Sequence, residues 1–302
     1  MRFVADHHFV IGSHHVNQGK PCQDHALSFV RSPAAFGVVS DGCGSGGETD
    51  LGARIINFST RALLWVPRDL PEGEDALSGF IPLIKKEQPK LLAQLKTLLA
   101  LEETDLLATS IIACLGPSRG WVHCVGDGVV AAKFADGSLL FSRLEWGNNM
   151  PFYPAYAEQK ENFVIAHGGK DRSVLSDECW LFTEENGYVR AGETRYTLAF
   201  AMEGVTFHYH DDDHQKLVAL AVFTDGVTQV DGVDWKDVVR SLLNFKTIEG
   251  QFAKRRMNRF VKDMQKTGKG PLDDLAYAVI VRAPTDEGEA DDDIEANTEV
   301  RA

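Results

Sequence analysis

Cysteine is scarce in this sequence, and its five cysteines are scattered singly, with no C-x-x-C pair among them. Structural zinc sites usually draw their cysteines from such close pairs, and a disulfide framework needs an even number. The pattern argues against both and favours a reducing compartment. The chain also lacks any run of about 18 to 20 apolar residues, the length that a membrane helix needs. We therefore expect no membrane-spanning segment.

Basic residues are in the minority, because 31 Lys and Arg stand against 44 Asp and Glu, giving a net charge of −13. A chain of this sign repels nucleic-acid backbones and anionic membrane surfaces, so neither is expected as a partner. It is compatible with binding divalent cations. The opening residues Met1–Asp6 lack the basic-then-apolar layout of a secretory signal. A cytoplasmic location is the default expectation.

The acidic residues are unevenly distributed along the chain. Residues 285–302 contain eight acidic residues and one basic residue, a charge of −7 out of −13, which leaves −6 for the rest. A segment with so much charge and so few large apolar residues cannot bury enough surface to fold by itself. We predict one domain over residues 1–284 and an acidic, disordered tail over 285–302.

The middle of the chain predicts a series of consecutive strands. Four β-rich runs follow one another between residues 107 and 143, separated by short turn sequences that contain glycine or proline. Strands joined in this way form antiparallel meanders. Apolar residues at helical spacing are found in other parts of the chain, at 49–64, 76–101, 235–243 and 252–266. This clustering of helices predicts an α+β fold.

Three local predictions accompany this assignment. Pro82 and Pro89 are expected to interrupt the second helical stretch, because proline lacks a backbone N–H. Residues 196–202 are expected to form a strand. Residues 146–177, rich in glycine, proline, asparagine and aromatic residues, predict an irregular insertion.

Four aspartates occupy comparable places at the ends of predicted strands. Asp41 and Asp225 each follow an apolar run and precede a glycine. Asp273 stands before the last apolar run, and Asp24 stands at the start of an early strand. Carboxylates at strand ends can converge at one edge of a sheet core. There they repel one another and have raised pKa values unless cations neutralise them.

A cluster of this kind points to a particular chemistry. All-oxygen ligand sets suit Mg²⁺ or Mn²⁺ rather than zinc. Two such ions lower the pKa of a shared water and hold a phosphoryl group for in-line attack. The glycine after Asp41 has no Cβ, so a backbone carbonyl can approach a metal there. The aspartates therefore predict a metal-dependent phosphohydrolase.

Other interpretations of the same residues exist. Asp-Gly is a very common turn dipeptide, so each pair taken alone is compatible with a plain turn. The run Gly42–Gly47 also fits the G-x-G-x-x-G pattern of dinucleotide-binding proteins. Against that interpretation, Asp41 would face the pyrophosphate, and the following segments do not alternate as βαβ units.

Six short motifs accompany these aspartates in a fixed order. The first runs from Gly12-Ser13-His14-His15 to Cys22-Gln23-Asp24. The remaining five are Val38-Val39-Ser40-Asp41-Gly42, Ala108-Thr109-Ser110-Ile111, Val125-Gly126-Asp127-Gly128, Phe223-Thr224-Asp225-Gly226 and Asp273-Asp274-Leu275-Ala276. The ordered set resembles the metal-dependent protein serine/threonine phosphatases of type 2C, the PPM family. The C-Q-D of the first motif is similar to the bacterial branch.

The resemblance implies a fold and a set of metal ligands. The fold would be a four-layer α-β-β-α sandwich of two antiparallel sheets flanked by helices, with residues 146–177 in the place of the family's flap. The site would hold two Mn²⁺ or Mg²⁺ ions. By the same resemblance, Asp41 would bridge both ions, the Gly42 carbonyl would hold the second, and Asp225 and Asp273 the first. Asp24 would sit beside the pair, with Asp41 as the other catalytic residue, and Asp127 would help to bind a third ion.

The sequence departs from the family pattern at two positions. The family often has a phosphate-binding arginine five residues before the position of Asp24, where this chain has Gly19. Lys20, His14 or His15 are the candidates to replace it, and a lysine would bind as a point charge rather than as a fork. The family's Ser or Thr in the last motif is Ala276.

The resemblance implies hydrolysis of phosphoserine and phosphothreonine in a protein substrate, with a cognate Ser/Thr kinase and a place in signalling. Gly19 and Ala276 leave open the alternative of a catalytically weak pseudophosphatase that binds a phosphoprotein or kinase. A phosphohydrolase of small phosphoesters is a further alternative. Two other clusters have simpler interpretations. The histidines at 208, 210 and 214 are typical of an exposed hairpin tip, although a metal role is conceivable, and the arginines at 255, 256 and 259 are typical of a solvated helix face.

Overall fold

The computed structural model describes residues 2–65, 77 and 79–283, so the predicted acidic tail lies outside the described residues. Twelve described strands form two antiparallel sheets. The seven-stranded sheet has the order β1 (Arg2–Val10), β12 (Leu275–Ala283), β11 (Leu217–Phe223), β6 (Gly128–Phe134), β7 (Leu139–Trp146), β8 (Ser173–Thr183) and β9 (Gly187–Thr197). The five-stranded sheet has the order β10 (Val205–Tyr209), β5 (Gly120–Val125), β4 (Ser110–Leu115), β3 (Ala34–Ser40) and β2 (His25–Arg31).

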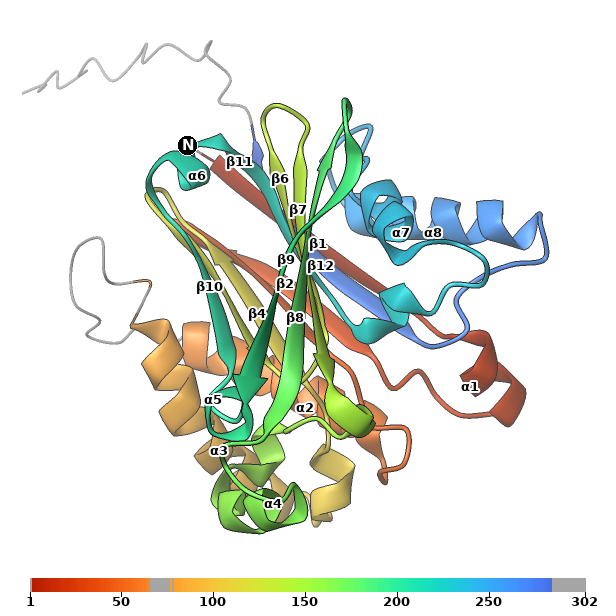
Figure 1. Ribbon diagram of the computed structural model, residues 1–302. Coiled ribbons are helices and arrows are strands. Elements are labelled where there is room, and N and C mark those ends of the chain that lie inside the picture. The colour runs from red at the N-terminus through yellow and green to blue at the C-terminus, as the bar shows by residue number, and fades with distance from the viewer. Residues whose placement is uncertain (1, 66–76, 78, 284–302) are drawn as a thin grey trace, which may run out of the picture.

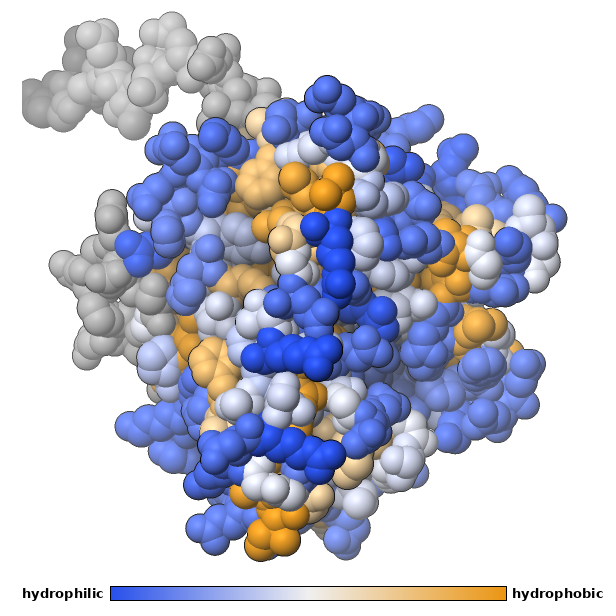
Figure 2. All heavy atoms as spheres, viewed as in Figure 1, coloured by the Kyte–Doolittle hydropathy of each residue, from blue (hydrophilic) through white to orange (hydrophobic). Residues whose placement is uncertain are grey.

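Helices cover the outer faces of both sheets (Figure 1). α2 (Thr49–Trp65) and α3 (Phe80–Leu98) pack on the five-stranded sheet. α7 (Trp235–Leu242) and α8 (Phe252–Gln265) pack on the seven-stranded sheet. The predicted α-β-β-α sandwich is therefore confirmed. None of the described helices is long and apolar enough to cross a membrane, and the face in Figure 2 is mostly hydrophilic with small hydrophobic areas.

The central strands are apolar on both faces because they separate two cores. Along β12, Ala276, Ala278 and Ile280 face the other sheet, whereas Tyr277 and Val279 face α7 and α8. Strands buried on both faces have continuous apolar runs rather than alternating ones. This explains why the strands that carry the aspartates are so conspicuous in the sequence.

Shorter elements connect these layers. They are the helices α1 (Ser13–Gln18), α4 (Lys160–Ala166), α5 (Leu198–Ala201) and α6 (Asp211–Lys216), and the 3₁₀ turns η1 (Glu103–Leu106), η2 (Gly147–Asn149), η3 (Pro154–Glu158) and η4 (Asp225–Thr228). The insertion predicted over 146–177 occupies 147–172 between β7 and β8. It is built around tilted and edge-on rings of Phe152, Tyr156 and Phe163.

Two local predictions were wrong. The strand predicted over 196–202 ends at Thr197, and α5 follows, because one helical turn buries Leu198 and Ala201. The predicted interruption at Pro82 and Pro89 does not occur, since α3 is continuous. Pro82 lies in the first turn, where the N–H has no partner within the helix. The cost of Pro89 is offset by the packing of the buried face of α3, formed by Phe80, Ile84, Gln88 and Leu92.

One carboxyl lies inside the sandwich away from the aspartates discussed above. Asp177 of β8 is 7% exposed, and its Oδ1 has no hydrogen-bond partner among the described residues. Burial raises its pKa from 3.8 to about 6, although a hydrogen bond from Ser142 opposes this. The folded chain binds the proton more tightly than the unfolded chain, so stability falls as the pH rises from about 4 through about 6.

We therefore expect Asp177→Asn to be more stable than the parent at pH 8, by about 1–3 kcal/mol, and to show no such gain at pH 4. Urea unfolding at the two pH values measures this. Asp171→Asn, at an exposed position, is the matched control and should change little. An equal gain at both pH values would contradict the charge-based explanation.

Candidate metal centre

Strand register places the predicted aspartates at one end of the sandwich. His25 pairs with Ser40, so Asp24 and Asp41 lie side by side just beyond β2 and β3. In the other sheet, Phe223 pairs with both Tyr277 and Val129. The residues just beyond these pairs include Asp225, Asp273 and Asp127. Two sheets thus contribute to one carboxylate cluster.

The carboxyls of this cluster affect each other's ionisation. Burial, followed by the nearby Asp225 charge, raises the pKa of Asp127 to about 7. Burial and the Asp273 charge raise the pKa of Asp225 to about 6. The pKa values of Asp24 and Asp41 are also raised well above the usual carboxyl range, mainly by burial. Such mutual repulsion is what a bound cation would relieve.

Thr224 joins the two sheets at this point. Its hydroxyl donates to Asp24 Oδ2 at 2.6 Å and accepts the backbone N–H of Ala276 at 2.9 Å. On the other side, Thr109 Oγ1 accepts the backbone N–H of Asp41 at 2.9 Å. Thr109 therefore fixes the backbone at Asp41, and Thr224 fixes the Asp24 side chain.

Sequence reasoning missed Gln229, which lies at the end of η4. Its Nε2 donates to Asp273 Oδ2 at 3.1 Å and to Asp225 Oδ2 at 3.3 Å. One amide thus holds two carboxylates from distant parts of the chain. The only signal in the sequence is that Gln229 follows Asp225 by four residues, which places it one turn further on.

Asp274 is the second residue whose role was missed. It is buried, and it accepts the backbone N–H groups of Gly12 at 2.7 Å and Gln23 at 2.6 Å. Its Oδ2 also lies 2.8 Å from His15 Nδ1. His15, Asp273 and Asp274 offer ligand atoms within 4.8 Å of one another, the one such group among the described residues. Asp274 therefore ties the first motif to the last.

The three phosphate-binding candidates are placed differently. Lys20 is exposed, and its Nζ donates to Gly44 O at 3.2 Å, in the loop after Asp41. The His14 side chain is exposed, whereas the His15 ring is held by Asp274. Gly19 ends α1 in the left-handed conformation, with φ of 67°. An arginine at that position would be strained, which gives a structural reason for its absence.

Glycines in the motifs are required by close approach of two backbones. A Cβ on Gly42 would lie 2.7 Å from Thr49 O and 2.9 Å from Gln23 O. On Gly226 it would lie 1.7 Å from Asp274 O. Neither glycine has a positive φ. The Asp-Gly pairs are therefore packing positions between motifs and not left-handed turns.

The insertion after β7 also reaches the cluster. Tyr153 hydrogen-bonds to Cys43, which directly follows Gly42. Burial is the main cause of the raised pKa of Tyr153. This contact anchors the insertion beside the carboxylates.

Two alternative sites are not supported by the structure. β3 and β4 are antiparallel neighbours, so Gly42–Gly47 does not belong to a parallel βαβ unit. Of the three clustered histidines, His214 is buried and its Nε2 lies 2.9 Å from Gly116 O. In place of the predicted hairpin tip there is the short helix α6, in which the His214 side chain is buried.

Comparison with known proteins settles the family. The model of the family described as protein phosphatase 2C matches residues 11–265. The chain belongs to the protein phosphatase 2C family. No curated protein matches this 2C-family chain by sequence.

Solved structures share its fold. The serine/threonine phosphatase Stp1 from Staphylococcus aureus is 13% identical with a TM-score of 0.54, and the match covers 94% of this chain and 96% of that one. The S. agalactiae serine/threonine phosphatase is 14% identical with a TM-score of 0.51, over 93% and 99% of the two chains. The roles of individual residues in this 2C-family chain must be argued from its own geometry.

Proposed function

We propose that this 2C-family chain is a metal-dependent phosphatase that hydrolyses phosphoserine and phosphothreonine in a protein. The observation that carries the proposal is the convergence of five aspartates from both sheets, with pKa values raised by burial and by one another at four of them. Such a cluster is unfavourable without cations. Its carboxylate oxygens suit Mn²⁺ or Mg²⁺.

The proposed ligand roles follow the motifs. Asp41, Asp225, Asp273 and the carbonyl of Gly42 would hold two ions. Asp127 would help to hold a third ion, and Asp24 would stand beside the pair. The bound ions supply an activated water and neutralise charge on the phosphoryl oxygens.

Other side chains of this chain position those ligands. Gln229 fixes the orientation of the Asp225 and Asp273 carboxylates through one amide. Thr224 fixes Asp24. Asp274 keeps the first motif against the last, so the backbone around Asp24 and Gln23 does not drift from the cluster. These contacts hold the ligands in place before substrate arrives, which reduces the reorganisation needed during the reaction.

Lys20 is the best placed of the phosphate-binding candidates. It lies over the loop that follows Asp41, and only a neutral carbonyl contacts its ammonium in the described structure. A Ser/Thr kinase that phosphorylates the same protein would supply the substrate. The family and the carboxylate cluster support hydrolysis. The pseudophosphatase stays the alternative, and the turnover assay distinguishes the two.

The proposal is tested by comparing phosphopeptides and small phosphoesters side by side, each with Mn²⁺, with Mg²⁺ and with EDTA. We expect turnover of phosphoserine and phosphothreonine peptides that depends on a divalent ion. Metal binding in calorimetry without any turnover would favour the pseudophosphatase. Turnover of metabolite phosphates alone would favour the small-molecule phosphohydrolase.

Replacing Lys20 with alanine should raise KM for a phosphopeptide by about five- to thirtyfold, since a charge-assisted hydrogen bond is worth about 1–2 kcal/mol at an exposed site. The effect on kcat should be smaller. Lys90→Ala, at an exposed position on α3, is the matched control. An unchanged KM in Lys20→Ala would remove Lys20 from the phosphate site.

A further inference from the structure

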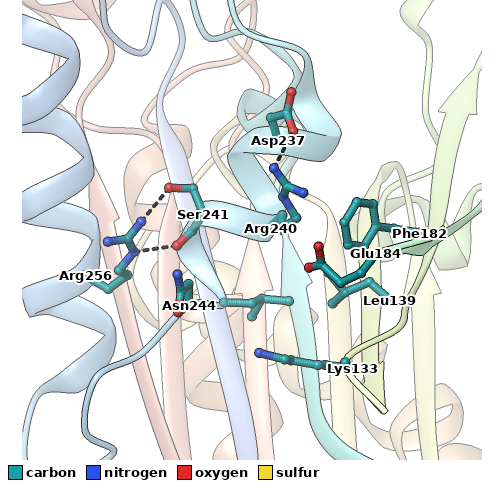
Figure 3. A pocket seen from close by; sticks show the side chains of 11 residues that line it. Lys133, Leu139, Phe182, Glu184, Asp237, Arg240, Ser241, Asn244 and Arg256 are labelled. Atoms are coloured by element: carbon teal, nitrogen blue, oxygen red, sulfur yellow. Dashed lines mark hydrogen bonds and ion pairs between the residues drawn. The ribbon is translucent and has the colours of Figure 1, made fainter. Parts of the chain in front are cut away.

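A basic trough crosses the outer face of the seven-stranded sheet, on the α7 and α8 side. It consists of two adjoining pockets of about 580 and 630 Å³ that share Asn244 and Arg256. Figure 3 shows the first pocket, between the β6–β7 turn, β8 and α7. The second runs along α8. The cations that line the trough are Lys133, Arg240, Lys246, Arg255, Arg256, Arg259, Lys262 and Lys266.

The trough has the opposite sign to the rest of the chain. Its eight cations are accompanied by three carboxylates, Glu184, Asp237 and Asp263, which gives a charge of +5. Because the whole chain carries −13, the remainder carries −18. On α8 the cations at 255, 259, 262 and 266 recur at helical spacing, so they share one face.

The anchoring contacts leave this charge largely uncompensated. Arg256 donates to the carbonyl and hydroxyl of Ser241, and Arg255 donates to Glu249 O at 2.6 Å (Figure 3 shows the Arg256 contacts). These acceptors are neutral. Asp263 is shared between Lys266 at 2.6 Å and Arg259 at 3.8 Å. Arg240 lies 3.4 Å from Asp237. The guanidinium groups of Arg255 and Arg256 are therefore held by neutral acceptors, whereas those of Arg240 and Arg259 each have a carboxylate partner.

Strand register places the described end of β12 two strands away from Lys133, a residue that lines the trough. Ala219 of β11 pairs with Val281 of β12 on one side and with Lys133 of β6 on the other. Lys133 and Val281 are therefore two strand spacings apart, roughly 9–10 Å. Residues 285–302, with a charge of −7, follow Val281 after three residues.

The acidic segment is also long enough for the site. Eighteen extended residues span up to about 60 Å, whereas the 14 residues of α8 span about 21 Å. Its eight carboxylates match the eight cations in number, and Ile294 and Val300 are its large apolar residues. Phe182 and Phe252 offer an apolar floor to such side chains.

From the charge, the register and the length, we propose that residues 285–302 bind in the basic trough of the same chain. Lys133, in the first pocket, lies near the end of β6 opposite to Asp127, so a segment bound there would not cover the carboxylate cluster. The effect of this binding is to neutralise a surface that would otherwise attract foreign anions such as nucleic acid or lipid.

The test is zero-length carbodiimide coupling of carboxylates to lysines in the full-length chain, read by mass spectrometry. We expect links from residues 286–299 to Lys133, Lys246, Lys262 or Lys266 within one chain. Lys86 and Lys90 on α3, exposed at 73% and 55% of their side chains, are reachable controls and should link much less. At 1 M salt the yield should fall at least about tenfold, because the screening length shrinks to about 3 Å.

Two variants sharpen the test, and circular dichroism checks that each is folded. Arg255→Glu with Arg259→Glu keeps all four lysines and should lower the coupling yield at least about tenfold, since screening or reversing the local field removes the attraction. The triple variant Asp291→Asn, Asp292→Asn and Asp293→Asn should also lower the coupling yield, and it changes no described contact.

Three coupling results would each overturn the proposal: equal coupling to α3 and to the trough, coupling only between two chains, or variants that couple like the parent. So would RNA or anionic vesicles that bind the parent chain through the trough while the segment fails to couple.

Discussion

Replacing Asp41 with asparagine is expected to lower kcat/KM for a phosphopeptide at least about a thousandfold, as losses of central catalytic groups do. The carboxylate is a proposed metal ligand, and an amide offers neither the charge nor two anionic oxygens. Asp225→Asn should give a loss of similar size. Raising the Mn²⁺ concentration should recover little of either loss. The measurement is steady-state hydrolysis over a range of metal concentrations.

The same substitution should act on stability in the opposite direction. Burial raises the pKa of Asp41, so the folded chain holds this proton more tightly than the unfolded chain does, and the carboxyl lowers stability in EDTA at pH 8. Asp41→Asn removes the titrating carboxyl, and the melting temperature in EDTA should rise. Asp212→Asn, exposed on α6, should change neither property. Full activity in Asp41→Asn, or a variant less stable than the parent in EDTA, would contradict the assignment of Asp41.

Replacing Gly226 with alanine is expected to cost about 3 kcal/mol or more of folding stability, at the upper end of overpacking effects. The new Cβ would lie 1.7 Å from the carbonyl oxygen of Asp274, and that contact is backbone that cannot rotate away. The two motifs must therefore separate. Activity should fall by about a hundredfold even with excess metal, because a shift of about 1 Å in a positioned group has that effect.

Gly192→Ala is the matched control for this prediction. Gly192 lies in β9 and has no positive φ, and a methyl group added there would meet no atom within 4 Å. The substitution should be neutral in urea unfolding and in the phosphatase assay. If Gly226→Ala is as stable and active as Gly192→Ala, the close approach between the two motifs is not a real constraint.

The place of the aspartates could be predicted because each stands next to a continuous apolar run. A strand buried on both faces appears in the sequence as a continuous apolar run. Polar side chains occur at its end, where the backbone leaves the core. Antiparallel register then brings Asp24 to Asp41 and Asp225 to Asp127 without further information. Their roles as metal ligands stay predictions.

The supporting residues could not be found in the same way. Gln229 and Asp274 act through contacts with residues up to 262 positions away, and their places near Asp225 and Asp273 in the sequence do not reveal those contacts. The exposed strand β9 shows no alternation of apolar and polar residues, because both of its faces are solvated. α5 was mistaken for a strand because one helical turn is too short to show its periodicity. The local sequence therefore identifies the candidate ligands, but not the residues that position them.

The pairing of β1 with β12, which matches Arg2 with Ala283, has a consequence for biosynthesis. The first strand leaves the ribosome about 265 residues before its partner, a delay on the order of 10–50 s at roughly 5–20 residues per second. Asp273, Asp274 and the strand that follows them belong to the last part of the described chain to be made. The proposed ligand set therefore cannot be complete before Asp273 and β12 have been made. Chains that lack β12 should be inactive, and activity should begin only once β12 has inserted between β1 and β11.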